Sequence, residues 1–302
     1  DHPAPGHKVH VVVRDDDAFV EHDLSQESFR TNPRHAFNLN LTEELSATLE
    51  TLGDKPTLGE FFEIHEGIHS GNIREELFVD SKVDESCREL IFGRDEIRPY
   101  VLQWKGKFVR LSAVPEKRSR QRYANVGRKE WYEQDKILVR RTGDYVLAAV
   151  DRTRRYASNN FFLLIPKSET TPPLDAVAAV LNSKFMTWFF RTIEPRKGRM
   201  FAEVKIKHLR TFPLPCPAGR RAEYKELSEL GKHRAKLAQE SLKNKSPESI
   251  IPLRRQMDYL DGEIEKVVLK ALNVVEAYRE AAGSAKWKGD EDGTKQEKMS
   301  YR

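Results

Sequence analysis

The chain has 302 residues, of which 33% are charged, and a formal net charge of +5. It is long enough to bury a full hydrophobic core and to divide into two or more units. Cys87 and Cys216 are the two cysteines, which excludes a disulfide framework and a C-x-x-C metal knuckle and favours a reducing cytoplasm. No apolar run approaches the ~18 residues that cross a membrane, and the N-terminus is no signal peptide.

The N-terminal part is acidic. Residues 1–66 hold 5 Lys and Arg against 14 Asp and Glu. The pattern predicts a strand over Lys8–Val13 and short helices over Ser25–Phe29 and Thr42–Leu52. From Thr57–Ile64 onward we expect short strands broken by Gly and Pro. The chain begins with Asp1 rather than Met, and we interpret it as a fragment of a longer protein.

His65-Glu66-Gly67-Ile68-His69 matches the H-E-x-x-H pattern of zinc proteases. That chemistry needs a helix, because the two histidines must share one helix face to hold the metal. Gly67 lies inside the motif and Ser70-Gly71-Asn72 follows it, so we expect a strand entering a turn rather than a zinc site.

The middle of the chain is basic. Residues 94–155 hold 17 Lys and Arg against 8 Asp and Glu, a net charge of +9. Cations displace counterions from a phosphate backbone and flat rings stack on bases, so this composition favours a nucleic-acid partner. The alternative is a solvated charged face whose rings lie in the core. The interleaved aromatic residues are Tyr100, Trp104, Phe108, Tyr123, Trp131, Tyr132, Tyr145 and Tyr156.

Strands are predicted over residues 136–140, 145–150 and 161–166, and one apolar helix over 177–190. A second basic cluster follows that helix and includes Arg196, Lys197 and Arg199. Glu203-Val204-Lys205 is an E-x-K triplet that, with Asp175, could indicate a metal-dependent nuclease. Such triplets are frequent in a highly charged chain, and Asp175 stands at the head of a helix, so we regard this hypothesis as the rival.

Charged helices follow the prolines at 213, 215 and 217. We expect a helix over about Ala222–Leu242 that folds back on a second helix beginning at Ser246-Pro247. The second helix carries apolar residues at heptad-like spacing, as in a coiled coil. The alternative is a helix that simply packs against its neighbours. Its members are Leu253, Met257, Leu260, Ile264, Val267 and Ala271.

Six landmarks occur in a characteristic order. They are Gly67–Asn72, Leu90–Tyr100, Lys136–Arg140, Asn159–Phe161, Leu181–Phe185 and Leu209–Pro215. In this order the segment from Gly67 to Pro217 resembles the C-terminal specificity domain of TaqI-like adenine-specific DNA methyltransferases, which include type IIG restriction–modification enzymes. The resemblance implies a mixed α/β target-recognition domain of short strands, followed by an αα-hairpin.

The resemblance also implies a domain order. Residues 1–66 are expected to connect to an absent upstream methyltransferase core, 67–217 to form the specificity domain and 218–282 the helical hairpin, with 283–302 a disordered tail. Neither Asn32-Pro33-Arg34 nor Thr171-Pro172-Pro173-Leu174 completes the N-P-P-Y-type motif that holds a flipped adenine, and a glycine-rich S-adenosylmethionine loop is absent. We therefore expect a non-catalytic fragment without a cofactor. The resemblance implies that S-adenosylmethionine binds the parent protein, expected to be a site-specific adenine methyltransferase with or without endonuclease activity.

The expected partner is double-stranded DNA, together with the methyltransferase domain of the same polypeptide. We expect contacts with backbone phosphates from Lys117, Arg118, Arg120, Arg122, Arg196, Lys197 and Arg199. We expect contacts with base edges from Arg94, Arg98, Arg154, Arg155 and Asn159. The alternatives are a metal-dependent nuclease or metalloprotease fragment, and an RNA-binding or protein-interaction module.

Overall fold

The computed structural model describes residues 6–15, 18–26, 43–117, 119–143, 145–193, 203–244, 246–275 and 278. The chain divides into two compact units, one comprising Asp1–Asp54 with Leu272–Arg302 and the other Lys55–Ala271. In the first unit, β1 (Lys8–Asp15) pairs antiparallel with β2 (Ala18–Ser25). Helix α2 (Glu43–Gly53) belongs to the same unit, whose small core includes Val11, Leu24 and Leu49.

The strand at 8–13 and the helix at 42–52 are thus confirmed. The helix expected over 25–29 is wrong at Ser25, which ends β2 because its backbone completes the ladder opposite Lys8. Residues 27–29 lie outside the described part of the chain.

The second unit contains two four-stranded sheets. The first has the order β10 (Ala148–Asp151), β9 (Lys136–Arg140), β12 (Phe161–Pro166), β3 (Phe62–Glu66), all antiparallel. The second has the order β11 (Tyr156–Ala157), β5 (Cys87–Ile91), β8 (Phe108–Arg110), β4 (Phe78–Val79), in which β11 and β5 run parallel. A short ladder joins β6 (Ile97–Arg98) to β7 (Val101–Leu102).

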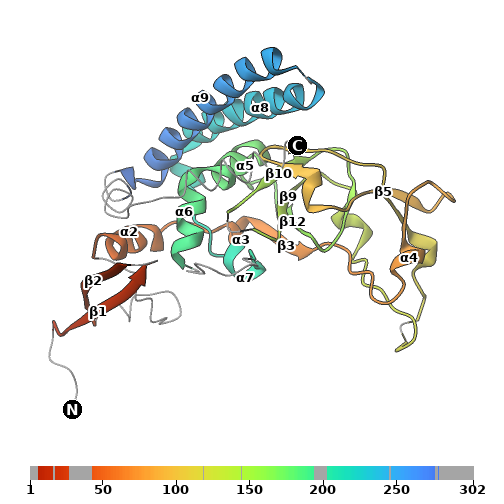
Figure 1. The fold of residues 1–302 in the computed structure, drawn as a ribbon, viewed down its shortest axis with the longest axis horizontal. Helices are drawn as coiled ribbons and strands as arrows, with labels where there is room; N and C mark the ends of the chain where they lie inside the picture. Colours follow the sequence, from red (N-terminus) through yellow and green to blue (C-terminus); the bar gives the residue numbers. More distant parts are fainter. Residues whose placement is uncertain are drawn as a thin grey trace. The chain divides into compact units, whose positions relative to one another are not determined.

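One hydrophobic cluster joins the two sheets. Leu138 and Leu163 of the first sheet pack with Leu90, Ile91 and Val109 of the second. Because successive strand residues face opposite sides, complete burial of β12 from Phe161 to Ile165 requires cover on both faces of its sheet. Helix α5 (Leu174–Asn182) packs against β9 and β10. The arrangement is visible in Figure 1.

Short helical turns lie between the strands or follow the last of them. They are α4 (Arg74–Leu77), α7 (Ile206–Leu209), η2 (Arg94–Glu96), η3 (Leu111–Ala113), η4 (Lys129–Trp131) and η5 (Pro217–Gly219). Residues 57–61 were predicted to extend into strand but instead form the turn α3 (Leu58–Phe61) before β3. The physical reason is a cap, since the Glu60 carboxylate accepts the Thr57 backbone N–H at 2.7 Å.

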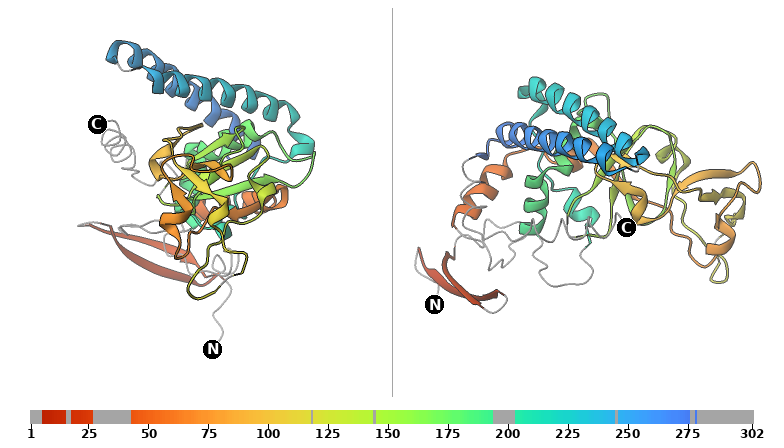
Figure 2. Two further views of the ribbon diagram at one scale, coloured as in Figure 1. Left: turned by 90° about the vertical axis from the view of Figure 1, so that its right-hand side faces the viewer. Right: turned by 45° about the horizontal axis from the view of Figure 1, so that its top comes forward.

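Helices α8 (Arg221–Lys243) and α9 (Pro247–Leu272) form the expected αα-hairpin, and Figure 2 shows them side by side. Gly231 lets α8 approach α5 closely, because a Cβ there would lie 2.7 Å from the Asp175 carbonyl oxygen. Arg234 of α8 forms two hydrogen bonds with Asp261 of α9, at 2.9 and 3.1 Å, and its guanidinium lies over the Tyr100 ring. The mixed α/β class and the C-terminal hairpin are therefore confirmed.

The single helix predicted over 177–190 is wrong, because the chain breaks at Ser183 into α5 and α6 (Lys184–Ile193). The Ser183 hydroxyl donates to the Val180 carbonyl at 2.7 Å and accepts the Met186 N–H at 3.1 Å. Glu265 of α9 then accepts the N–H groups of Lys184 and Phe185, each at 2.9 Å. These acceptors satisfy donors that a helix start leaves open, which stabilises the break.

The Glu265 cap predicts a pH dependence of stability. Burial raises the pKa of Glu265 to about 7 from its ordinary value of 4.5. Because the folded pKa is raised, the associated stability is complete below about pH 4.5 and is lost as the pH rises through about 7. Over this pH range the free energy of unfolding of wild type, measured in urea, should fall by roughly 1–3 kcal/mol more than that of Glu265→Gln.

Glu263→Gln is the matched control, because Glu263 is on the same helix and pairs only with Lys266 among the described residues. It should keep the wild-type pH profile. An unchanged profile in Glu265→Gln would contradict the raised pKa of the buried Glu265 carboxyl.

Candidate nucleic-acid interface

The basic loop, residues 115–123, is fastened to the turn that follows β3. The side chain of Asn72 donates to the Gln121 carbonyl at 2.8 Å and accepts the Tyr123 N–H at 2.9 Å. Gly71 has φ +55°, and a Cβ there would lie 2.0 Å from the Tyr123 carbonyl oxygen. The turn must therefore carry glycine for the two backbones to meet, and the loop projects from this fixed base.

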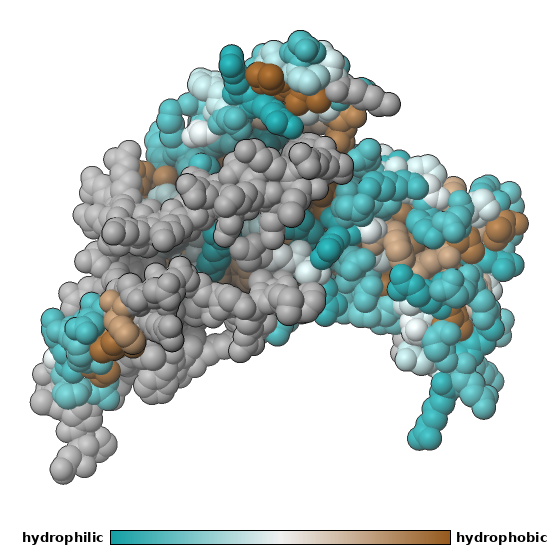
Figure 3. All heavy atoms as spheres, in the orientation of Figure 1, coloured by the Kyte–Doolittle hydropathy of each residue, from teal (hydrophilic) through white to brown (hydrophobic). Residues whose placement is uncertain are grey.

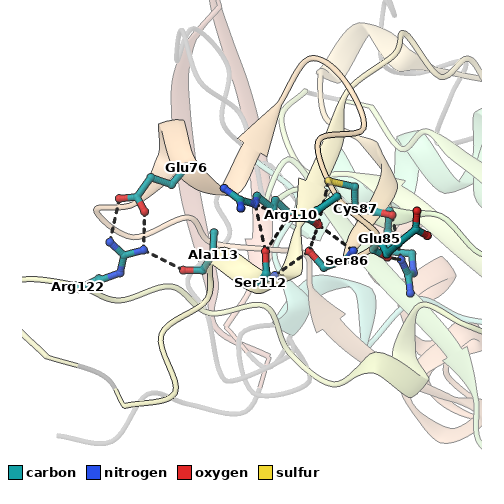
Figure 4. Close-up of polar contacts among 10 residues, drawn as sticks. Glu76, Glu85, Ser86, Cys87, Arg110, Ser112, Ala113 and Arg122 are labelled. Carbon is teal, nitrogen blue, oxygen red and sulfur yellow. Dashed lines mark hydrogen bonds and ion pairs between the residues drawn. The ribbon is translucent and has the colours of Figure 1, made fainter.

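Cations of the basic loop differ in how they are held. Arg122 forms a bidentate pair with Glu76 of α4, at 3.1 and 2.5 Å, and also donates to the Ala113 carbonyl (Figure 4). Lys117 and Arg120 are exposed and form no ion pair within the described residues. These two cations are therefore available to an external anion, whereas Arg122 must first leave Glu76.

Asp84 joins the start of β5 to the end of β8. Its carboxylate accepts the Ser86 N–H at 2.8 Å and the Arg110 Nε–H at 2.7 Å, together with hydroxyl groups of Ser86 and Ser112. Hydrogen bonds from Ser86 and Arg110 hold the pKa of this carboxyl well below its usual range. Asp84 is a fixed part of the scaffold, and it holds Arg110 with it.

A buried ion pair organises the turn after β10. The Lys136 ammonium lies 2.6 Å from Asp151 and also donates to the Tyr132 carbonyl at 2.7 Å, with both charged side chains fully buried. Asp151 further accepts the backbone N–H groups of Thr153 and Arg155, at 2.9 and 3.0 Å. The carboxylate thus fixes the course of residues 152–155, which we call the Asp151 turn.

The Asp151 turn carries two of the predicted base readers. Arg154 is exposed with φ 58°, and it has no ion pair in the described part of the chain. Arg155 is mostly buried, lies 2.6 Å from Glu89 and packs its guanidinium over Trp104. The turn therefore presents Arg154 outward and keeps Arg155 against the second sheet.

Replacing Asp151 with Asn should destabilise the protein strongly, because Lys136 would remain buried without its counterion. Breaking one side of a buried pair costs about 3–5 kcal/mol. Urea unfolding measures the loss. Asp135→Asn is the control, since Asp135 is half exposed and lies 3.9 Å from Arg152, a geometry that contributes at most about 1 kcal/mol. Equal losses in the two variants would contradict the role of the buried pair.

Glu96 fixes the segment that carries Arg94. Its carboxylate accepts the backbone N–H groups of Phe92, Gly93 and Lys105. Burial raises the pKa of Glu96. Arg94 begins η2 next to this anchor and is exposed, whereas Arg98 in β6 is partly buried.

The H-E-x-x-H match adopts the predicted strand and turn. His65 and Glu66 lie in β3, and the His65 ring stacks on Trp131 with centroids 3.7 Å apart. His69 contacts the Glu66 carboxylate at 2.5 Å through Nε2, and its Nδ1 lies 3.3 Å from the amide nitrogen of Asn159. This amide is therefore already engaged, although it was predicted to read a base.

The described residues contain no group of three His, Cys, Asp or Glu side chains placed to hold a metal ion. In the E-x-K alternative, Glu203 lies 3.7 Å from Arg141, and Asp175 pairs with Arg152 at 2.6 Å. Each carboxylate therefore has a basic partner.

The aromatic residues of the basic segment divide between core and surface. Tyr100, Tyr132 and Tyr156 are buried, and the last two stack with centroids 4.2 Å apart. Trp104, Phe108, Trp131 and Tyr145 are partly buried, whereas Tyr123 is 44% exposed. For most of these rings the core interpretation is correct. Tyr123 is the exposed ring, and it lies at the end of the basic loop.

The predicted contact residues therefore form separate groups within one unit. Lys117, Arg120 and Arg122 share the basic loop, Arg154 and Arg155 share the Asp151 turn, and Arg94 and Arg98 flank Glu96. Arg118, Arg196, Lys197 and Arg199 lie outside the described residues. Figure 3 shows that the side of this unit around α4 and β5 is mostly hydrophilic. Sequence reasoning missed Asn72 and Glu76, which position the basic loop through contacts distant in sequence. It also missed Asp151, which pairs with Lys136 and fixes the turn that follows it.

No helix in the described ranges combines the length and apolarity that a bilayer crossing requires. The type IIL restriction–modification enzyme MmeI, whose structure was determined in complex with DNA, is similar to this chain with a TM-score of 0.49 and 12% identity. The match covers 72% of this chain and 33% of that one, so this chain spans about a third of that enzyme. No curated protein sequence matches the chain. Residues 88–214 match the family model of the TaqI-like C-terminal specificity domain.

Proposed function

We propose that this chain is the sequence-specific duplex-DNA recognition module of an adenine-specific DNA methyltransferase or type IIG restriction–modification enzyme. The observation that carries the proposal is the family match at 88–214, which coincides with exposed cations on anchored loops. Backbone cations position such a module on DNA, and a few arginines or amides read base edges.

The geometry supports a division of labour. Lys117 and Arg120 project from the basic loop without ion pairs in the described chain, which suits phosphate contacts. Arg94 and Arg154 stand on segments fixed by Glu96 and Asp151. Direct readout needs a donor held in register with a base edge, so these two arginines are the better candidates for it.

The proposal extends to the parent protein. The methyl-transfer chemistry and its S-adenosylmethionine would belong to a linked methyltransferase domain in a cytoplasmic enzyme. Any DNA-cleaving activity of that enzyme would lie in its other domains.

The backbone assignment predicts a change in salt dependence. Each lost phosphate contact lowers the slope of log affinity against log salt by about 0.9, so Lys117→Ala/Arg120→Ala should lower it by about 1.8 on any duplex. Fluorescence anisotropy with a labelled duplex of mixed sequence measures the slope. Lys225→Ala/Lys236→Ala removes the same charge from exposed positions of α8 and should leave the slope nearly unchanged.

Equal slopes in wild type and the Lys117/Arg120 variant would contradict the assignment of the basic loop. Tighter binding of single-stranded RNA than of duplex DNA by wild type would favour the RNA-binding alternative.

Arg154→Ala should behave differently. The variant should lose about 1–3 kcal/mol of binding free energy for a duplex that the wild-type chain selects from a random library. For an unselected duplex it should lose much less. Arg152→Ala is the control within the same turn, because Arg152 is held by Asp175 at 2.6 Å. An equal loss on both duplexes would make Arg154 a phosphate contact.

A further inference from the structure

Acidic residues before and at the start of the basic segment at 94–155 supply counterions to part of it. Five ion pairs connect acidic residues between 76 and 95 with cations between 105 and 155 in the described part of the chain. They are Glu76–Arg122, Asp80–Lys107, Asp84–Arg110, Glu89–Arg155 and Asp95–Lys105. Five of the 17 cations in the basic segment at 94–155 are therefore neutralised by these acidic residues.

These pairs are not equivalent. Asp84 accepts hydrogen bonds from Ser86, Arg110 and Ser112 and is part of the scaffold. Among the described residues, the Glu76 carboxylate has hydrogen bonds from Arg122 alone, and the two side chains are 50% and 47% exposed. An exposed pair of this kind is weak because water and salt screen it, so an external anion can displace it.

A carboxylate and a phosphate present similar geometry to arginine. Both accept two parallel N–H groups from one guanidinium, which is how Glu76 holds Arg122. Glu76 thus occupies the position that a backbone phosphate would take on Arg122, and the two anions compete for the same donors.

We infer that Glu76 is a specificity-determining residue that withholds Arg122 from the phosphates of non-cognate DNA. The inference rests on the proposed function. Phosphate contacts are independent of sequence, so a cation that pairs within the protein contributes little to non-specific binding. On a cognate site, base contacts supply the free energy with which Arg122 can exchange Glu76 for a phosphate.

The test uses the full chain and a labelled duplex of mixed sequence. In Glu76→Gln the neutral side chain no longer forms an ion pair with Arg122, so Arg122 is free to contact a phosphate. The affinity for the duplex should rise several-fold at about 0.1 M salt, and the slope of log affinity against log salt should steepen by about 0.9. Glu75→Gln is the matched control, because it removes the same charge from the neighbouring position of α4. Glu75 is exposed and forms no ion pair in the described chain.

A double variant separates the release of Arg122 from a change in loop structure. Adding Arg122→Ala to Glu76→Gln should abolish the gain and leave the affinity of the Arg122→Ala single variant. Equal gains in Glu76→Gln and Glu75→Gln would overturn the inference, because general charge would then be the cause. Weaker binding by Glu76→Gln would also overturn it, by showing that the pair only positions the loop. If wild type binds no duplex even at low salt, the proposed function itself fails.

Discussion

The buried ion pair between Lys136 and Asp151 is the constraint on which the Asp151 turn, with its candidate base reader Arg154, depends. It lies where β9 pairs with β10, and both side chains are fully buried. Burial of opposite charges costs desolvation and is compensated only when the remaining hydrogen-bonding groups are satisfied. The Tyr132 carbonyl and the N–H groups of Thr153 and Arg155 satisfy them. The same contacts that make the pair tolerable also fix the turn that presents Arg154.

The fold also neutralises part of the charge of the basic segment. The segment at 94–155 has a net charge of +9 in sequence, but the fold brings the acidic residues between 76 and 95 against it. Each such pair reduces non-specific attraction for a polyanion, which depends on the number of cations that can reach phosphates. Lys117, Arg120 and Arg154 differ from Arg110 and Arg155 because no ion pair holds them in the described chain. Under the proposed function, selective neutralisation leaves a small set of contacts to decide recognition.

Much of the fold could be predicted because its signals are local. The strands at 136–140 and 161–166 are apolar runs, and Gly67 within H-E-x-x-H already favoured a turn over a helix. The break at Ser183 could not be predicted, because the apolar pattern continues through it and Glu265, the residue that caps α6, is distant in sequence. Likewise, Arg122 meets Glu76 because Asn72, in the turn before α4, holds the loop that carries Arg122. An acidic stretch beside a basic one was the available hint, but the identity of each pair needs the fold.

Amide hydrogen exchange with and without duplex DNA tests the central claim most directly, because it reports where the duplex contacts the chain. The account predicts slower exchange in the basic loop at 115–123 and in the Asp151 turn at 152–155. Exchange in the hairpin helices at 221–243 and 247–272 should change little. Protection confined to the hairpin, or no protection at the two loops under conditions where the duplex is bound, would contradict the account.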